Sequence, residues 1–403
     1  MISRIANTWA LGTWRRPDIL LYLMAGAVPL SFATWQALLN NFAVEQVGFG
    51  GAEIGVLQSL REVPGFLAFA VVFLLLLFRE QTLAYVSLAL LGIGTAITGW
   101  YPTVIGLYCT TVLMSIGYHY YETVQISLSL QWVEKARAPE TLGRIIAVGS
   151  FTSIVTFGVI WLAFDLFGLD FSSVYLLGGG VTCAVALLVW LAFPRFPEKV
   201  RQHRHLVLKK RYWLYYALTF MSGARRQIFI VFAGFLMVEK FEFSVVAITL
   251  LFLINSVANV IFAAKIGRLV ARLGERRALV FEYAGLIIVF AAYAFVNHAG
   301  FAATLYVIDH LFFALAIAIK TYFQKIADPA DIASSAGVGF TINHIAAVCL
   351  PAAFGLLWLV SPPAVFLSGA VMAGLSLLLS LNVPRDPTPG NEVVVNLPRY
   401  VTT

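Results

Sequence analysis

The sequence predicts an all-α polytopic membrane protein, with twelve transmembrane helices in two pseudo-symmetric six-helix bundles. Of its 403 residues, 60% are hydrophobic and only 12% are charged, and the mean hydropathy is +0.86. Soluble domains are about half apolar and a quarter charged, so this composition excludes a soluble globular protein. Twelve spans of about 20–25 residues fit within the chain and leave short loops. The long apolar runs, such as residues 71–78 and 286–296, lack the alternation of polar residues that a membrane strand needs.

Charges and Pro/Gly positions separate the apolar runs into two sets of six spans. The first set comprises residues 18–43, 52–78, 82–100, 103–131, 142–166 and 172–193. The second set comprises residues 212–238, 244–266, 278–297, 301–325, 336–360 and 363–383. These boundaries predict a first bundle, a basic cytoplasmic linker, a second bundle and a disordered cytoplasmic tail, at residues 1–194, 195–211, 212–383 and 384–403 respectively.

The two halves of the chain resemble each other weakly. A shift of 194 residues aligns residues 20–22 with 214–216, and residues 43–45 with 237–239, without a gap. A parallel six-plus-six repeat with a basic linker is typical of secondary transporters. A chance match between apolar segments is the alternative explanation.

The distribution of basic residues predicts the orientation. If the N-terminus is cytoplasmic, 22 of the 27 Lys and Arg residues lie at or beyond cytoplasmic span ends, and only Lys240 lies outside. The basic excess therefore indicates topology, and no nucleic-acid partner is expected. The chain also lacks an Asn-x-Ser/Thr glycosylation acceptor. We expect a monomer that crosses the bacterial inner membrane many times, with both termini in the cytoplasm.

The segment 267–277 carries the clearest motif of the chain. It resembles the loop signature of the major facilitator superfamily, G-x-x-x-D-[RK]-x-G-[RK]-[RK]. The matching positions are Gly267, Arg272, Gly274 and Arg276. Ala271 replaces the acidic residue of the signature, and Glu275 replaces a basic one.

This resemblance implies the fold of the superfamily and transport in general, without indicating a subfamily. It also implies a gating role for the four matching residues, although the chain lacks the acidic residue that helps to latch the cytoplasmic gate in the family. In physical terms, the glycines permit a tight turn between two helices, and the arginines anchor that turn at an anionic membrane surface.

Seven acids and bases lie well inside the predicted spans, where each would cost about 3 kcal/mol if it faced lipid. They are Arg61, Glu62, Glu122, Arg225, Arg226, Asp309 and Lys320, and His119, His310 and His344 join them. Glu282 lies near the start of the span 278–297 and is not counted with them. These groups must therefore face protein or water. With neutral histidines the seven sum to +1, which favours an anionic or zwitterionic solute.

Arg225 and Arg226 lie close to the middle of the span 212–238. Because neighbouring helix positions differ by about 100°, the two side chains point in different directions. We expect one of them to face a cavity and the other to pair with Glu62 or Asp309. A guanidinium suits a carboxylate, phosphate or sulfonate of a substrate. A charge pair that only holds helices together is the alternative.

The segment 118–122 combines three tyrosines with His119 and Glu122, which share one helix face. A histidine and a carboxylate in a dry site can exchange a proton. The hypothesis is therefore proton coupling through four residues, Glu122, His119, Asp309 and Glu62. A histidine that is merely hydrogen-bonded is the alternative.

Asp309 and Lys320 are eleven positions apart, which places them on one face and about 16 Å apart along a regular helix. Lys320 and His344 are expected to line a channel. The predicted substrate-binding residues are Arg225, Arg226, Arg61, Trp35, Gln36, Tyr118, Tyr121, His310 and Asn255.

The function predicted from these residues is that of a secondary active transporter for a small organic anion or zwitterion, working by alternating access with proton coupling. A lipid, amphiphile or drug exporter and a non-transporting sensor of the same fold are the alternatives. No nucleotide loop, metal cluster or nucleophile–base pair stands at a recognisable spacing, so we expect no enzyme, catalytic residue, cofactor or metal.

Overall fold

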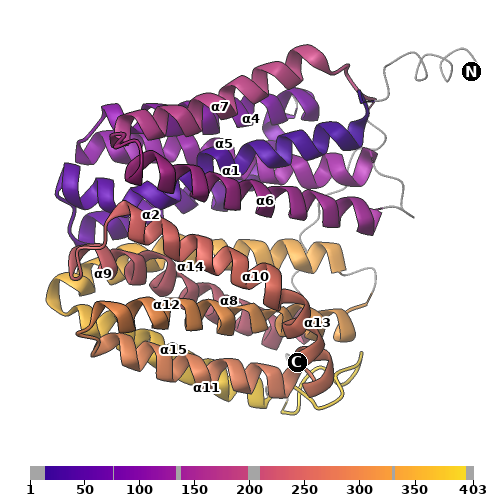
Figure 1. Ribbon diagram of the computed structural model, residues 1–403. Coiled ribbons are helices and arrows are strands. Elements are labelled where there is room, and N and C mark those ends of the chain that lie inside the picture. Colours follow the sequence, from indigo (N-terminus) through magenta and orange to yellow (C-terminus); the bar gives the residue numbers. More distant parts are fainter. Residues whose placement is uncertain (1–13, 76, 133–137, 198–208, 329–331, 396–403) are drawn as a thin grey trace, which may run out of the picture. The chain divides into compact units, whose positions relative to one another are not determined.

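The computed structural model describes residues 14–75, 77–132, 138–197, 209–328 and 332–395. These residues are almost entirely helical, and the chain divides into two compact units (Figure 1). Unit 1 comprises residues 1–48, 60–202 and 244–253. Unit 2 comprises residues 49–59, 203–243 and 254–403. Most of the predicted linker 195–211 lies outside the described residues.

The helices of the first half are long and connected by short turns. They are α1 (Pro17–Asn41), α2 (Gly51–Phe66), α3 (Val71–Leu74), α4 (Glu80–Ile97), α5 (Val104–Trp132), α6 (Ala138–Asp165) and α7 (Phe171–Ala192). Shorter turns extend some of them, namely the π-helix η3 (Phe42–Val47) and the 3-10 helices η4 (Leu67–Ala70) and η5 (Thr98–Trp100). The predicted span 52–78 is therefore interrupted, because α2 ends at Phe66.

The second half begins at the 3-10 turn η7 (Lys210–Tyr212). Its helices are α8 (Trp213–Gln227), α9 (Gly234–Glu239), α10 (Val245–Leu273), α11 (Glu275–Ala294), α12 (Ala299–Phe313), α13 (Ile317–Ile326), α14 (Ile332–Val360) and α15 (Pro362–Leu381). The π-helix η8 (Ile228–Ala233) connects α8 to α9, and the 3-10 turn η9 (Ala314–Ala316) connects α12 to α13.

The same pattern of helix packing occurs in each unit. In unit 1, α4 packs against α5 and α7, and α1 packs against α6 and α7. In unit 2, α11 packs against α12 and α15, and α8 packs against α14 and α15. Each of these four pairings of the first half thus has its counterpart at the corresponding place of the second half. This correspondence is the structural form of the weak sequence repeat.

Ten helices or helix runs among the described residues are long and apolar enough to cross a membrane. The predicted spans 52–78 and 103–131 are not among these ten. The span 52–78 includes residues that lie outside the described part of the chain, whereas the span 103–131 contains polar groups that lower its hydropathy, including His119 and Glu122. Helix α5 has 29 residues, or about 43 Å, and therefore exceeds the thickness of a bilayer core of about 30 Å.

Two short segments group with the unit opposite to the one that chain order predicts. Residues 49–59, at the start of α2, belong to unit 2, where the Ser59 hydroxyl accepts a hydrogen bond of 3.0 Å from the Ala352 amide. Residues 244–253, at the start of α10, belong to unit 1, where Phe252 lies 5.5 Å from Phe157 between ring centroids. Tertiary contacts, and not sequence order, decide these boundaries.

The chain after α15 does not follow the prediction of a disordered tail over residues 384–395. The Asn382 side chain donates to the Val395 carbonyl and accepts from the Val395 amide, while the Tyr322 hydroxyl donates to the Glu392 carbonyl. Val393 is buried. Pro and polar composition predicts disorder, but this valine and these hydrogen bonds hold the segment against unit 2. Residues 396–403 lie outside the described residues.

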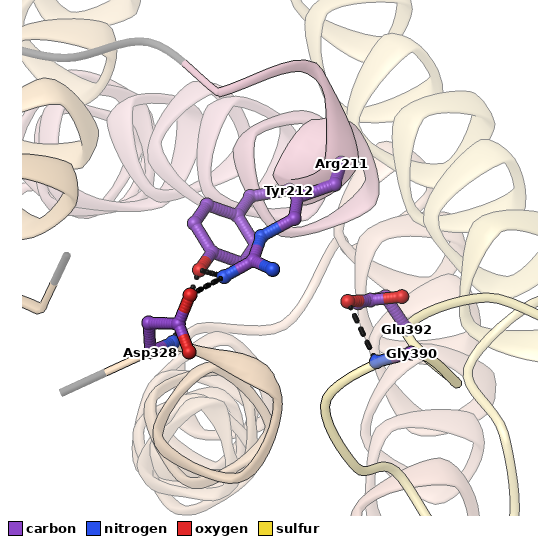
Figure 2. Close-up of polar contacts among 5 residues, drawn as sticks. All are labelled: Arg211, Tyr212, Asp328, Gly390 and Glu392. Carbon is purple, nitrogen blue, oxygen red and sulfur yellow. Dashed lines mark hydrogen bonds and ion pairs between the residues drawn. The ribbon is translucent and has the colours of Figure 1, made fainter.

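Figure 2 shows the polar contacts near this segment. An Arg211 Nη2 donates to Asp328 Oδ2 at 2.6 Å, and the Asp328 amide donates to the Tyr212 hydroxyl at 3.1 Å. The Glu392 carboxylate accepts from the Gly390 amide at 3.0 Å and so closes its own turn. The contacts of Asp328 with Arg211 and Tyr212 connect the start of α8 to the chain just after α13.

A run of three glycines allows α7 to approach its neighbours closely. A Cβ atom at Gly179 would lie 2.3 Å from the Ala96 nitrogen and the Gly92 oxygen of α4, and one at Gly178 would lie 2.4 Å from Thr34 Oγ1 of α1. A Cβ atom at Gly180 would have nothing within 4 Å. The run therefore serves helix packing at its first two positions only.

We expect Gly179→Ala to reduce the free energy of unfolding by about 1–3 kcal/mol, because backbone atoms cannot yield to the added methyl group. Gly180→Ala is the matched control, and it should be neutral or stabilising by up to about 1 kcal/mol, since Ala favours a helix. Thermal unfolding of both variants in detergent, followed by tryptophan fluorescence, tests this difference. Equal melting temperatures would contradict the packing role.

Candidate functional site

Three ionisable side chains from three helices meet inside unit 2. Arg225 of α8, Glu282 of α11 and Asp309 of α12 are each 0% exposed. Arg225 Nη2 lies 3.6 Å from Glu282 Oε1, and Arg225 Cζ lies 4.4 Å from the centre of the Tyr283 ring. Asp309 is within electrostatic range of both Arg225 and Glu282. We call these three residues the buried triad.

The apolar periodicity of the helices buries the two carboxyl groups. Glu282 lies on the face of α11 that also buries Leu279, Leu286 and Val289, at spacings of three and four residues. Asp309 continues the buried face of α12 that begins at Ala302, Leu305 and Tyr306. Each acid thus occupies a position where the helix pattern calls for an apolar residue.

The triad carries more acid than base. None of its side-chain nitrogen or oxygen atoms makes a hydrogen bond with the described residues. Full ionisation would leave one guanidinium against two carboxylates, a net charge of −1 in a site without exposure. A proton on either carboxyl group makes the triad neutral. Its simplest chemistry is therefore to take up and release one proton.

Arg226, the next residue, lies in the opposite environment. Its side chain is exposed near the middle of the span Lys210–Glu239, and it makes no ion pair or hydrogen bond with any residue that the structure describes. It acts electrostatically on the half-buried His310 of α12. The π-helix η8 begins two residues later, and such wide turns are frequent at functional sites.

Aromatic rings lie beside Arg226 on the same unit. Phe229 follows it by one helical turn and stacks on Tyr306 with 4.7 Å between ring centroids. The Phe229 centroid is also 6.1 Å from that of His310. We call Arg226, Phe229, Tyr306 and His310 the recognition face, which combines an exposed cation and a half-buried imidazole with two buried aromatic rings.

Unit 1 contains a second cluster, in which aromatic rings surround a buried ion pair. Phe32 stacks on Tyr118 with 4.3 Å between ring centroids and lies 6.2 Å from Trp35. Arg61 Cζ lies 5.8 Å from the Trp35 ring centre. Arg61 also pairs with Glu62, and both side chains are less than a tenth exposed.

His119 lies next to this ion pair. One of its ring nitrogens and a Glu62 oxygen are within 4.8 Å of each other, and its ring meets that of Tyr118 edge-on at 5.0 Å. The Ser115 hydroxyl donates to the Arg61 carbonyl. The arrangement thus places an imidazole close to a carboxylate that is already paired with Arg61.

The other predicted residues lie in varied surroundings. Gln36 and Glu122 are half-buried, Tyr121, His344 and Asn255 are buried, and Lys320 is exposed. Asp309 and Lys320 were expected to line one face of a regular helix. The 3-10 turn η9 interrupts that helix between them, and Asp309 is buried whereas Lys320 is exposed.

The predicted loop after the eighth span is shorter than expected. Helix α10 continues to Leu273, so Gly267 and Arg272 are helical, and no atom lies within 4 Å of a Cβ built at Gly267. Gly274 alone makes the turn, with a φ of 78° that favours glycine. The expectation that both glycines permit the turn is therefore wrong for Gly267.

Glu275, the acid in place of a basic residue of the signature, is the first residue of α11. Its side chain is buried and pairs with Lys325, with Nζ 2.8 Å from Oε1. An acid at this position also suits the positive end of the helix dipole. This pair connects the start of α11 to the end of α13.

The family model described as Major Facilitator Superfamily matches residues 20–351. The chain belongs to the Major Facilitator Superfamily. Members of this superfamily are multi-pass membrane transporters, and the resemblance in segment 267–277 is thus confirmed over most of the chain. No curated protein sequence matches the chain significantly.

Solved structures of superfamily transporters share the fold. A variant of the nucleoside transporter NupG is 16% identical, with a TM-score of 0.76 over 91% of this chain and 99% of that one. A bacterial homologue of the human lysosomal transporter Spinster, in an inward-facing and occupied conformation, is 12% identical, with a TM-score of 0.73 over 94% and 98% of the two chains. At these identities the similarity establishes the fold alone.

Glu282 is the residue of the site that the sequence did not select. It is the eighth residue of α11, about 10 Å from the helix start, and was therefore counted with the span end. Its spacing of three residues from Leu279 and four from Leu286 is the signal that would have placed it on the buried face. One of the two arginines was expected to pair with Glu62 or Asp309. The structure instead pairs Arg225 with Glu282, and Asp309 lies within electrostatic range of Arg225.

We expect Arg225→Met to lower the free energy of unfolding by about 3–5 kcal/mol, because it leaves two buried carboxyl groups without their cation. The neighbouring substitution Arg226→Met is the matched control and should change stability by less than about 0.5 kcal/mol, since Arg226 is exposed. Adding Glu282→Gln and Asp309→Asn to Arg225→Met should restore part of the loss. Thermal unfolding in detergent measures all three variants, and an equal effect of the two arginine substitutions would refute the role of the triad.

Proposed function

We propose that this superfamily member is a secondary active transporter that moves a small organic anion or zwitterion by alternating access, coupled to protons. The observation that carries the proposal is Arg226, an exposed guanidinium near the middle of a membrane span without a partner among the described residues. A charge at this depth is costly in lipid, so it must meet water or a solute.

The argument for an anion rests on exposure and not on the total charge. With Glu282 included, the intramembrane acids and bases number four of each and sum to zero. The eight are Arg61, Arg225, Arg226, Lys320, Glu62, Glu122, Glu282 and Asp309. Arg61 and Arg225 are buried beside carboxylates, whereas Arg226 and Lys320 are exposed. The available charge in unit 2 is therefore positive.

The recognition face also favours an organic solute over an inorganic ion. The buried rings of Phe229 and Tyr306 pack against the half-buried ring of His310, and the His310 ring is the one that can contact an apolar or planar body. A guanidinium with five N–H donors can hold a carboxylate, phosphate or sulfonate in two hydrogen bonds. The nucleoside transporter NupG and the Spinster homologue, which share the fold, support transport as the general activity.

The buried triad supports proton coupling. Ionisation of both carboxyl groups would leave a net negative charge in a dry site, which costs several kcal/mol. One proton is therefore held by the pair Glu282 and Asp309 until water reaches the site. The other groups nearby are tyrosines, Tyr283, Tyr293 and Tyr306, with His310 and Arg226 on the adjoining recognition face.

We expect Arg226→Gln to weaken solute binding about 10–100-fold, because a hydrogen bond to a charged group contributes about 1.5–3 kcal/mol. The measurement is thermal stabilisation by a panel of carboxylates, organic phosphates and sulfonates with their neutral analogues, followed by uptake of the best ligand into proteoliposomes. Arg226→Lys should retain part of the affinity, and Arg277→Gln, which removes an exposed cation near the end of a span, should retain all of it. Normal uptake by Arg226→Gln would refute the proposal.

We expect Glu282→Gln and Asp309→Asn to abolish the acceleration of uptake by an imposed pH gradient, while exchange of labelled for unlabelled solute continues. Neither amide can release a proton, so the coupling to protons is lost while the conformational change that carries the solute remains. Proteoliposome uptake with and without the gradient measures this effect. Glu122→Gln in unit 1 is the competing variant, and if it alone abolished the acceleration, the proton site would lie in unit 1 instead.

A further inference from the structure

Three cations form a continuous row on the last turns of α10. Lys265, Arg268 and Arg272 are three and four residues apart and therefore share one helix face. All three side chains are exposed, and none makes an ion pair or hydrogen bond with the described part of the chain. We call these three residues the basic stripe. Neither the recognition face nor the buried triad includes them.

The same face of α10 is apolar on the side of the membrane span. Val257 and Ile261 precede Lys265 at spacings of four residues, and both are exposed. Phe262 is also exposed, and Lys265 Nζ lies 5.0 Å from its ring centre. A shallow hollow of about 540 Å³ lies along the face. Its lining residues are Phe262, Lys265, Ile266, Arg268, Leu269 and Arg272.

The spacing along the helix matches the layers of a bilayer. The apolar span of α10, Val245–Phe262, has 18 residues, or about 27 Å, close to the thickness of about 30 Å of the hydrocarbon core. Lys265 and Arg268 follow about 4.5 Å and 9 Å beyond Phe262, which is the depth of phospholipid headgroups. The change from apolar to basic thus falls at the membrane surface.

We propose that this face of α10 binds an anionic phospholipid, with the phosphate at the basic stripe and an acyl chain along Val257 and Ile261. Three cations without carboxylate partners attract an anionic headgroup and repel the choline of a zwitterionic one. Phe262 and Leu269 flank the stripe and provide apolar contact next to the phosphate. Free phosphate has the same charge chemistry but lacks the acyl chain, so the lipid is the occupant that fits both parts of the face.

Native mass spectrometry of the full chain in detergent, with added dioleoyl-phosphatidylglycerol, tests the proposal. The variant carries Lys265→Gln, Arg268→Gln and Arg272→Gln together. Each cation near a membrane surface contributes about 1 kcal/mol, so the variant should lose affinity for this lipid about 100-fold. The matched control removes three exposed cations elsewhere on the chain, by Arg195→Gln, Lys210→Gln and Arg385→Gln, and should bind as the wild type does.

Two further arms identify the ligand. Dioleoyl-phosphatidylcholine should bind the wild type more weakly than phosphatidylglycerol, and inorganic phosphate in large excess should not displace the bound lipid. Equal binding of both lipids, displacement by phosphate, or equal losses in the variant and the control would each overturn the proposal. Lipid binding is measured without the transported solute, so this result is independent of the proposed transport function.

Discussion

Unit 2 depends on the neutralisation of one buried positive charge, that of an arginine. Arg225 is inaccessible to solvent, and a guanidinium removed from water must be paired. Its partners come from two other helices, Glu282 from α11 and Asp309 from α12. Three helices are therefore held by one electrostatic cluster. The surplus carboxyl group is the feature on which the proposed proton coupling rests, so under that proposal the residues that hold the helices together also exchange the proton.

Two adjacent arginines perform opposite tasks because the helix rotates by about 100° between them. Arg225 points into the unit and is neutralised there, whereas Arg226 points outward and remains available. The wide turn η8 follows at once and brings Phe229 against Tyr306 beside His310. The same short segment of chain thus carries an exposed cation and a buried aromatic ring that packs against the half-buried His310.

Charge has also been rearranged around the turn between α10 and α11. The superfamily signature expects an acid at position 271 and a base at position 275, and this chain has Ala271 and Glu275. Glu275 is buried and pairs with Lys325 at the end of α13. Without an acid at position 271, the cations Arg268 and Arg272 have no carboxylate partner among the described residues. The basic stripe therefore includes the residues on either side of a position where the signature has an acid and this chain has Ala271.

The sequence by itself determined the class of protein, the general fold and most of the ionisable side chains of the candidate site. Its length, its apolar runs and the segment 267–277 were sufficient to predict the fold. A charge inside a membrane is costly, so membrane spans are long apolar runs that the sequence shows directly. It also showed that Arg225 and Arg226 must point in different directions. The valine and hydrogen bonds that hold residues 384–395 were not recognisable, since a short polar segment has no periodicity.

Only the tertiary structure decided which arginine is buried and what compensates it. The members of a buried cluster come from distant positions in the chain, here residues 225, 282 and 309. Helix periodicity shows on which face of its helix each residue lies, but not which other helix packs against that face. The structure likewise decided that η9 separates Asp309 from Lys320, and that α10 runs to Leu273. Such breaks and extensions arise from packing between helices, which a single sequence records only in part.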